Sequence, residues 1–383
     1  MELAAMKTHA IRAQAMVLVC ISLIPGTRAQ VSTSVAYEYA EIAYPGARLT
    51  TVNGLNNSNT IVGSYFDSYD SVHGFVYRRG RFTAVNVAGA TATEVLGIND
   101  YGDIVGVYQL SGPLNFHGFL RHNGKFVTID SPRAQFGTTA FAINRAGTIV
   151  GSYDDAHGFT YSAGKYRTLD APQLQGEPAN TQLNGINNLG WIAGQVLTGG
   201  IWRGFWIVGN DLDFLESRST SDSQVTGING RGDIVGCHDA MAGFIAFHVE
   251  SSKESETSEK YPAQERLASC AASINFARVV VGNYFTVKQP YGFLGVPVLT
   301  LQVAVPRNHT VHTNPVHIVA SAQGNNPITH IQVWANFKKV FQVNGGELDA
   351  NVRLPVGTNV RLAISAIDSK RGTTKVVDTV TVY

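Results

Sequence analysis

The chain has 383 residues with 29 basic and 28 acidic side chains, so its formal net charge at pH 7 is +1. This near-neutral balance argues against nucleic acid or an acidic membrane as an electrostatic partner. Hydrophobic residues make up 44% of the chain and there are 39 glycines, which is typical of globular β proteins with many turns. The length suggests one large domain or two of moderate size.

The first 29 residues have the features of a secretory signal peptide. Lys7 and Arg12 make the start basic, residues 15–24 form an apolar core too short to cross a bilayer, and Thr27-Arg28-Ala29 fits a cleavage site. A retained membrane anchor is the alternative interpretation. Because no other long apolar run follows, we expect a protein secreted to the periplasm, the cell envelope or the outside, with no transmembrane segment in the mature chain.

From residue 54 onward, one motif occurs six times at intervals of 42 to 46 residues. The second copy reads Gly97-Ile98-Asn99 and continues to Gly106, and its third residue is Asn and its tenth Gly in every copy. The six asparagines are Asn56, Asn99, Asn144, Asn187, Asn229 and Asn275. A second motif, His-Gly-Phe in three copies and X-Gly-Phe in the others, follows each occurrence of the first.

Each copy has the pattern of four short strands separated by Gly, Asn and Asp turns. In the third copy we predict strands at residues 139–143, 148–153, 158–161 and 165–169. Four strands in about 40–45 residues is the size of a β-propeller blade. The sixth copy lacks a fourth strand, and residues 38–45, which align with residues 125–132, are expected to supply it and to close the ring.

After residue 298 the period disappears and seven alternating strands are predicted in about 85 residues, as in an immunoglobulin-like sandwich. These strands are expected at residues 300–305, 316–320, 331–335, 339–343, 349–354, 359–366 and 376–382. We therefore predict an all-β protein: a six-bladed β-propeller closed by an N-terminal strand, followed by an immunoglobulin-like β-sandwich. The predicted divisions are a signal peptide at 1–29, the propeller at 30–297 and the sandwich at 298–383.

The Gly-Ile-Asn…Gly…Ile-Val-Gly pattern with its His-Gly-Phe companion resembles the bacterial extracellular HAF repeat family, which is named after a His-Ala-Phe triplet. The resemblance covers about residues 38–296, with Gly in the middle of the triplet and His replaced in three of the six copies. It implies export and a propeller-like β fold, and it implies no catalytic residues. The C-terminal part looks like the immunoglobulin-like modules of secreted bacterial proteins, without the cysteine pair of antibody domains.

The repeated Asn and His favour a structural interpretation, because a side chain needed once for catalysis has no reason to recur in every copy. An Asn after a strand can bond its own backbone two residues further on. In the second motif, Gly allows close backbone approach and Phe is expected to lie between sheets. A polar run at residues 251–260 of the fifth copy is interpreted as a solvated loop in place of a tight turn.

Function in a repeat array is expected where the copies differ, on the rim formed by the loops that precede the first strands and join the second and third. Carboxylates, aromatic rings and arginines there suit a glycan or an extracellular protein, although a solvated rim without a ligand is the simpler interpretation. The candidate binding residues are Arg48, Asp67, Tyr69, Asp70, Glu94, Asp154, Asp155, Gln182, Trp202, Arg203, Gln224, His238 and Asp239.

A non-enzymatic scaffold that binds a glycan or protein is the preferred hypothesis, and the catalytic residues, if any exist, are unknown. The alternative is an extracellular polysaccharide hydrolase or lyase in the central channel, with Glu94, Asp155, Arg48 and Tyr65 as acid, base and charge-stabilising groups. A third possibility is a purely structural envelope component. No nucleophile elbow, zinc motif, calcium loop or phosphate loop occurs, so no cofactor or metal is predicted. Cys237 and Cys270 form a disulfide or remain as two buried thiols.

Overall fold

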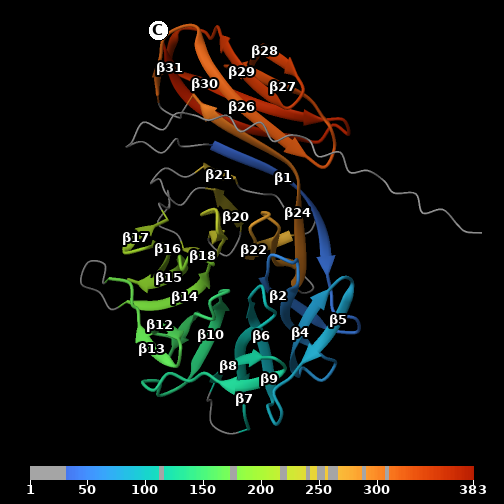
Figure 1. The fold of residues 1–383 in the computed structure, drawn as a ribbon, viewed down its shortest axis with the longest axis vertical. Coiled ribbons are helices and arrows are strands. Elements are labelled where there is room, and N and C mark those ends of the chain that lie inside the picture. Colours follow the sequence, from blue (N-terminus) through green and yellow to red (C-terminus); the bar gives the residue numbers. More distant parts are fainter. Residues whose placement is uncertain are drawn as a thin grey trace, which may run out of the picture.

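The computed structural model describes residues 32–111, 116–172, 179–215, 222–238, 242–247, 255–257, 266–286, 290–306 and 310–383. The ordered secondary structure of these residues consists of strands, with no α-helix. The chain is therefore all-β, as its short β-branched and aromatic segments predict. The repeat region lies at one end of the molecule and the C-terminal strands at the other (Figure 1).

The repeat region contains six four-stranded antiparallel units, and all but the sixth consist of strands consecutive in the chain. Unit one consists of β2 (Leu49–Leu55), β3 (Ile61–Phe66), β4 (Val72–Arg78) and β5 (Arg81–Val85). Unit two consists of β6 (Ala92–Ile98), β7 (Ile104–Gln109), β8 (Phe116–His122) and β9 (Lys125–Thr128). Unit three consists of β10 (Thr138–Ile143), β11 (Ile149–Tyr153), β12 (His157–Ser162) and β13 (Lys165–Thr168), each within two residues of the predicted strand bounds.

The fourth and fifth units repeat this arrangement, and the sixth is completed by the N-terminal strand. Unit four consists of β14 (Asn180–Ile186), β15 (Ile192–Thr198), β16 (Ile201–Val208) and β17 (Asp211–Phe214). Unit five consists of β18 (Ser223–Ile228), β19 (Ile234–His238), β20 (Ala242–Phe247) and β21 (Ser255–Thr257). Unit six consists of β22 (Arg266–Ile274), β23 (Val280–Thr286), β24 (Pro290–Val305) and β1 (Ser32–Ile42).

One expectation about the fifth unit is wrong in part. Within the polar run 251–260, residues Ser255–Thr257 are not loop but form β21, which pairs with Phe247–Ile245 of β20. A strand at the outer edge of a sheet needs only backbone pairing on one side, so it does not require the apolar pattern whose absence suggested a loop. The remainder of the run lies outside the described residues.

The Gly of the first motif and the Phe of the second face each other across the second and third strands. Gly63 pairs with Phe75 and Gly106 with Phe119, and both rings are fully buried. A Cβ added to Gly63 would lie 2.0 Å from the carbonyl oxygen of Thr51 and 2.8 Å from the Phe75 ring. The Gly is therefore required because the first strand and the Phe ring occupy the space of a side chain.

The N-terminal strand pairs with the last strand of the repeat region over its whole length. Ile42 lies opposite Gly292 and Glu41 opposite Phe293 in an antiparallel register that continues to Ser32 opposite Val303. Because unit six has no fourth strand of its own, this pairing covers the edge of β24 that would otherwise be exposed. The side-chain pattern of residues 38–45 predicted this partner.

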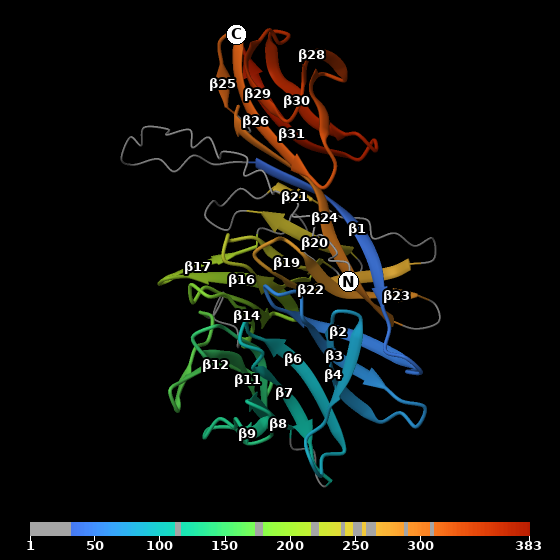
Figure 2. The same cartoon turned by 45° about the vertical axis from the view of Figure 1, so that its right-hand side comes forward.

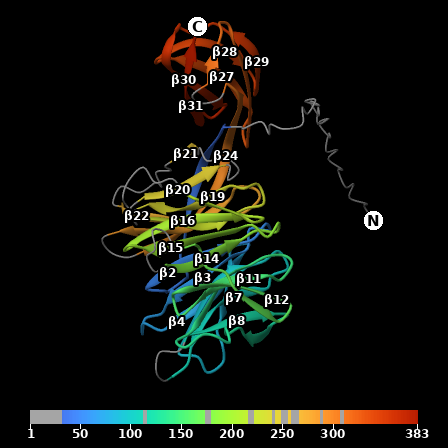
Figure 3. The same ribbon diagram turned by 90° about the vertical axis from the view of Figure 1, so that its left-hand side faces the viewer.

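The paired strands β1 and β24 run from the repeat region into the C-terminal part (Figures 2 and 3). β24 has 16 residues, and its second half pairs with β26 of the C-terminal sheet from Leu299 onward. The predicted boundary between residues 297 and 298 therefore falls inside a continuous strand. A register shift in β1 between Ala36 and Tyr37 lies beside this boundary.

The C-terminal part is a sandwich of two sheets around one apolar core. One sheet continues from β24 and β1 with β26 (Val316–Gly324) and β29 (Glu347–Val352). The other contains β25 (Val311–His312), β31 (Thr373–Val382), β30 (Gly357–Asp368), β27 (Ile328–Ala335) and β28 (Lys338–Asn344). The observed strands overlap all seven predicted ones. Within the described residues, no helix has the length and apolar character that crossing a membrane requires.

Candidate functional site

Some of the candidate rim residues meet where the first strands begin. Arg48, just before β2, forms a salt bridge with Asp70 in the loop between β3 and β4. In unit three, Asp154 of the loop between β11 and β12 accepts hydrogen bonds from the backbone N–H groups that precede β10. The two kinds of loop therefore lie side by side, as the antiparallel order of the strands requires.

The rim carboxylates hold their own loops in place. Asp67 accepts hydrogen bonds from the backbone N–H groups of Tyr69 and Ser71, and its Oδ2 lies 3.1 Å from Nε2 of His73. The hydrogen bond from Ser71 is the main cause that lowers the pKa of Asp67. Burial by itself would raise the pKa of Asp154, but three backbone hydrogen bonds outweigh it and lower that pKa. Both carboxylates are therefore ionised and already satisfied near neutral pH.

The repeated His belongs to the same framework. His117 stacks on Tyr108, with ring centroids 5.2 Å apart, and its Nδ1 lies 2.8 Å from Asp130. His157 does the same with Tyr153 and Asp170. These contacts tie the start of the third strand to the segment after the fourth, which supports the structural interpretation of the motif.

Three other candidates lie on inner strands rather than in loops. Glu94, Gln182 and Gln224 occupy the same position in the first strands of units two, four and five. Gln182 accepts a hydrogen bond from Gln195 at 2.8 Å. The carboxylate of Glu94 has no hydrogen-bond or ion-pair partner among the described residues, and burial raises its pKa.

The remaining candidates are more dispersed. Asp155 is exposed in the loop between β11 and β12, with φ of 51°. Trp202 and Arg203 lie within β16 instead of a loop, and the Trp202 N–H donates to Asp222. His238 ends β19, and Asp239 lies outside the described residues.

The two cysteines are joined in a disulfide that links unit five to unit six. Cys237 lies on β19 and Cys270 on β22, with their Cα atoms 4.9 Å apart. At the next junction, from unit six to unit one, Asn283 takes the position of Cys237 and makes two hydrogen bonds with the backbone of Val52. The disulfide is thus a covalent form of a contact that side-chain hydrogen bonds make elsewhere.

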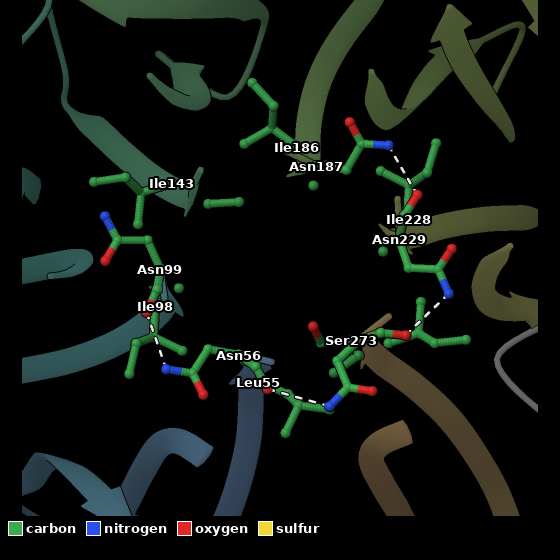
Figure 4. A pocket seen from close by; sticks show the side chains of 18 of the residues that line it. Leu55, Asn56, Ile98, Asn99, Ile143, Ile186, Asn187, Ile228, Asn229 and Ser273 are labelled. Atoms are coloured by element: carbon green, nitrogen blue, oxygen red, sulfur yellow. Dashed lines mark hydrogen bonds between the residues drawn. The ribbon is translucent and has the colours of Figure 1, made fainter. Parts of the chain in front are cut away.

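The opposite end of the inner strands contains a cavity in which no candidate residue was predicted. It has a volume of about 90 Å³ and is lined by the ends of the first strands and the turns that follow them. Five of the six repeated asparagines, all except Asn144, line it (Figure 4). Residues from all six units line the cavity, so it lies on the axis around which the units are arranged.

Each repeated Asn closes its own turn and also reaches the next unit. Asn187 accepts the N–H groups of Leu189 and Trp191 on Oδ1, and its Nδ2 donates to the carbonyl oxygen of Asn229 at 2.8 Å. The same Nδ2 bond runs from each unit to the next, and the last, from Asn275 to the carbonyl of Asn56, completes the cycle. Figure 4 shows several of these bonds around the cavity. The local turn was predicted; the connection between units was not.

Deeper in the cavity a second set of side chains links neighbouring inner strands. Asn53 donates to the carbonyl oxygen of Val95 at 2.9 Å, and Asn184 to that of Val225 at 3.0 Å. Within the described part of the chain, the Oδ1 atoms of these two residues have no donor. They are therefore available as acceptors in the cavity lining.

In five of the six units, the residue after the repeated Asn lines the mouth of the cavity. These residues are Asn57, Asp100, Asn188, Gly230 and Phe276, and Arg145 of unit three is not part of the lining. Asp100 accepts both the N–H and the Nδ2 of Asn57 and also Nδ2 of Asn188, each within 3.0 Å. Burial raises the pKa of Asp100, but these bonds and the charge of Arg145 outweigh it, so the pKa is lowered overall.

Sequence reasoning missed this position although the signal was present. The residue directly after the invariant Asn differs from unit to unit, and function in a repeat array is expected where the copies differ. The predicted candidates all came from the other end of the strands. Among the residues that line the cavity, Asp100 is the one carboxylate, so the lining has no acid and base pair.

No protein-family model matches this chain. No curated protein matches it either. Among solved structures, a gluconolactonase from Xanthomonas campestris is 10% identical, covers 69% of this chain and 97% of its own, and superposes with a TM-score of 0.40. The Aleuria aurantia lectin in complex with Fucα1-6GlcNAc is 9% identical, covers 80% of this chain and 97% of its own, and has a TM-score of 0.37. Similarities this low assign no function to the chain.

Proposed function

We propose that the six units are the blades of a closed six-bladed β-propeller that serves as a secreted, non-enzymatic scaffold and binds a glycan or a protein at its loop rim. The cycle of asparagine bonds and the pairing of β1 with β24 support the closed ring. The C-terminal sandwich, which we propose to be immunoglobulin-like, acts as a spacer or second adhesive module. Membership of the HAF repeat family and export by a signal peptide at residues 1–29 belong to the same proposal.

The non-enzymatic part of the proposal rests on the pKa values and hydrogen bonds of the rim carboxylates. A general acid at neutral pH needs a raised pKa, and a general base needs a free lone pair directed at the substrate. Asp67 and Asp154 have lowered pKa values and accept hydrogen bonds from their own loops, and Asp70 is paired with Arg48. These groups are better suited to shaping a rim than to proton transfer.

Exposed aromatic rings on the same rim support binding. Tyr69 in the loop between β3 and β4 is 88% exposed, and Phe136 before β10 is 69% exposed. Phe116 at the start of β8 is also exposed and is bridged to Gly137, next to Phe136. Exposed apolar rings framed by polar groups mark interaction sites, and flat rings provide a surface on which a sugar ring can pack.

The alternative of a channel hydrolase or lyase is favoured by one observation, the raised pKa of the partly buried Glu94. The other groups that this mechanism needs are engaged elsewhere. Arg48 is paired with Asp70, and Tyr65 stacks on Tyr44 with its pKa raised by burial to about 12. Asp155 is exposed in a rim loop.

Binding of the purified protein to an array of glycans and cell-wall polymers tests the proposal. We expect a Tyr69→Ala/Phe136→Ala variant to lose at least tenfold in affinity for any ligand found. Leu189→Ala, at an apolar residue that is 62% exposed at the other end, should leave the affinity unchanged. Absence of binding, or equal binding by the wild type and both variants, contradicts a rim site. If the protein releases reducing ends from a polysaccharide and Glu94→Gln abolishes this release, the enzymatic alternative is supported.

A further inference from the structure

The five-stranded sheet of the sandwich has an outer face with polar and aromatic side chains. On β27, His330, Gln332 and Trp334 alternate with residues of the apolar core. Because successive side chains of a strand point to opposite faces of the sheet, these three point away from the core. All three are partly exposed.

Trp334 belongs to a row of side chains that crosses four strands. Lys339 of β28 and Ala363 of β30 lie on either side of it in register, and Val377 of β31 lies beyond Ala363. Val377 is 40% exposed. At roughly 4.8 Å between neighbouring strands, this row is about 14 Å wide. It is an apolar strip that ends in a lysine at the edge strand.

Gln332 belongs to the next row on the same face. Gln342 of β28 and Ser365 of β30 lie on either side of it, and Lys375 of β31 lies beyond Ser365. Neighbouring rows on one face are two residues apart along a strand, which is about 6.8 Å. A row of hydrogen-bonding groups therefore runs beside the apolar strip.

Hydrogen bonds between side chains fix the middle of this face. The Nε1–H group of Trp334 donates to Oε1 of Gln332 at 3.2 Å, and Nε2 of Gln332 donates to Oε1 of Gln342 at 3.0 Å. Nζ of Lys339 donates to the same Gln342 oxygen at 3.2 Å, and Nε2 of His330 lies 3.1 Å from Nε2 of Gln332. Side chains that are already held in place lose little conformational freedom when a ligand binds.

The face is also positively charged. Its cations are Lys339, Arg361 and Lys375, and no outward position of the five strands holds Asp or Glu. None of the three cations forms a salt bridge with another described residue. The outer face of the other sheet differs, because it carries Glu347 and Asp349 on β29. The charge of the first face therefore favours an anionic partner.

The aromatic and polar groups indicate what kind of anion fits. Besides Trp334, the ring of Phe337 in the turn after β27 is 77% exposed, and the Arg361 guanidinium lies 4.5 Å from its centroid. Flat rings of this kind can pack against the apolar face of a sugar. Nε2 of Gln342 and the hydroxyl group of Ser365, which have no partner in the described part of the chain, can bind sugar hydroxyl groups.

We propose that this face binds an acidic polysaccharide whose repeating unit is a uronic acid. Its carboxylates pair with Lys339, Lys375 and Arg361, and a sugar ring packs on Trp334. An open sheet face can contact several successive sugars of one chain. The inference goes beyond the rim site, and it makes the sandwich an adhesive module in its own right instead of a spacer.

Isothermal titration calorimetry of the purified protein with tetragalacturonate tests this face. We expect Trp334→Ala to weaken the affinity about tenfold, because the stacked ring is lost, and Trp334→Phe to retain most of it. Lys339→Gln/Lys375→Gln should weaken it about fivefold, since two exposed ion pairs are lost. Lys125→Gln/Lys165→Gln removes the same charge from exposed positions of β9 and β13 and, as the matched control, should bind like the wild type.

Two further ligands separate the charge from the sugar. A neutral galactose tetrasaccharide should bind about fivefold more weakly than tetragalacturonate, because it has no carboxylates for the lysines. Tetraglutamate has the charges without the rings and should bind weakly, with no dependence on Trp334. Equal affinities for tetraglutamate and tetragalacturonate would show that the face recognises an acidic peptide as readily, and would overturn the proposal.

The proposal also fails if tetragalacturonate does not bind, or if the folded Lys339→Gln/Lys375→Gln variant binds it like the wild type. Thermal melting shows whether each variant is folded. The rim variant Tyr69→Ala/Phe136→Ala should bind tetragalacturonate with unchanged affinity. If this variant loses the ligand and the sandwich variants keep it, the ligand belongs to the rim, so failure of this inference and failure of the rim proposal are distinguishable.

Discussion

The repeated Asn illustrates how one side chain can serve two levels of structure. Its Oδ1 accepts backbone N–H groups within its own turn, and its Nδ2 donates to the carbonyl of the next unit. Asp would provide only the first function, and Ala neither. The recurrence of Asn, rather than of any residue suited to a turn, is therefore explained by the bond between units.

Substitution Asn187→Asp separates the two functions. The turn remains, but the carbonyl of Asn229 loses its donor and a buried carboxylate faces it. Since an unsatisfied buried acceptor costs about 1–3 kcal/mol and a buried charge adds to this, we expect the free energy of unfolding at pH 7 to fall by about 2–4 kcal/mol. Chemical denaturation measures the loss.

The pH dependence of the Asn187→Asp variant provides a second check. When the introduced carboxyl group is protonated it can donate to the Asn229 carbonyl, so its pKa is expected to be raised in the folded state. A raised folded pKa means that stability relative to the wild type recovers as the pH falls. The same substitution at the exposed Asn123 should have little effect, and an equal loss at both positions, or a loss independent of pH, would contradict the explanation.

Glu94 provides a second prediction about a buried carboxyl group, one that the natural chain already carries. Burial raises the pKa of this group, so the folded protein holds its proton more tightly than the unfolded chain does. The charged form therefore costs stability at a pH above the folded pKa, and this cost disappears below the pKa of the unfolded chain. Glu94→Gln should accordingly raise the melting temperature at pH 7 but leave it unchanged near pH 4.

Glu38→Gln, at an exposed position of β1, is the control and should change the melting temperature little at either pH. A Glu94→Gln variant that melts below the wild type at pH 7 would show that the carboxylate has a stabilising partner.

At the scale of the elements, the strands could be predicted because each depends on local pattern. Alternating residues, Gly and Asn turns and the period itself locate the strands of unit three to within two residues. The pairing of Gly63 with Phe75 could also be expected, because both residues belong to one meander. Edge strand β21 was missed because pairing at an edge leaves no apolar pattern.

Contacts between units could not be predicted in the same way. The disulfide joins residues 33 positions apart, and whether Cys237 and Cys270 meet depends on how two sheets are placed. The cavity is lined by residues of six units at once, so it depends on how all of them are placed. The rim residues, by contrast, could be named in part, since Arg48 and Asp70 meet through loops whose ends the strand order brings together.

At the scale of the whole molecule, two strands form a continuous antiparallel pair that belongs to both parts. Val35 and Phe293 share a core cluster of the repeat region, whereas Ala36 packs against the core of the sandwich. Ser34 Oγ also lies 2.7 Å from Thr374 Oγ1 of β31. The N-terminal strand therefore completes unit six and also attaches the sandwich to the repeat region.

Deletion of β1 should consequently damage both parts. A chain that begins at residue 44 loses the buried Val35 and Ile42, each worth about 1.5–3 kcal/mol on burial, and leaves the edge of β24 open. An open edge pairs with other chains, so we expect a lower melting temperature and oligomers or aggregates in size-exclusion chromatography. A chain that begins at residue 31 retains β1 and should remain monodisperse if the wild type is.

Addition of a peptide of residues 31–44 in excess should restore the melting temperature of the truncated chain, because the peptide can pair with β24 in trans. A truncated chain that melts like the intact one and does not associate would show that the repeat region does not need this strand.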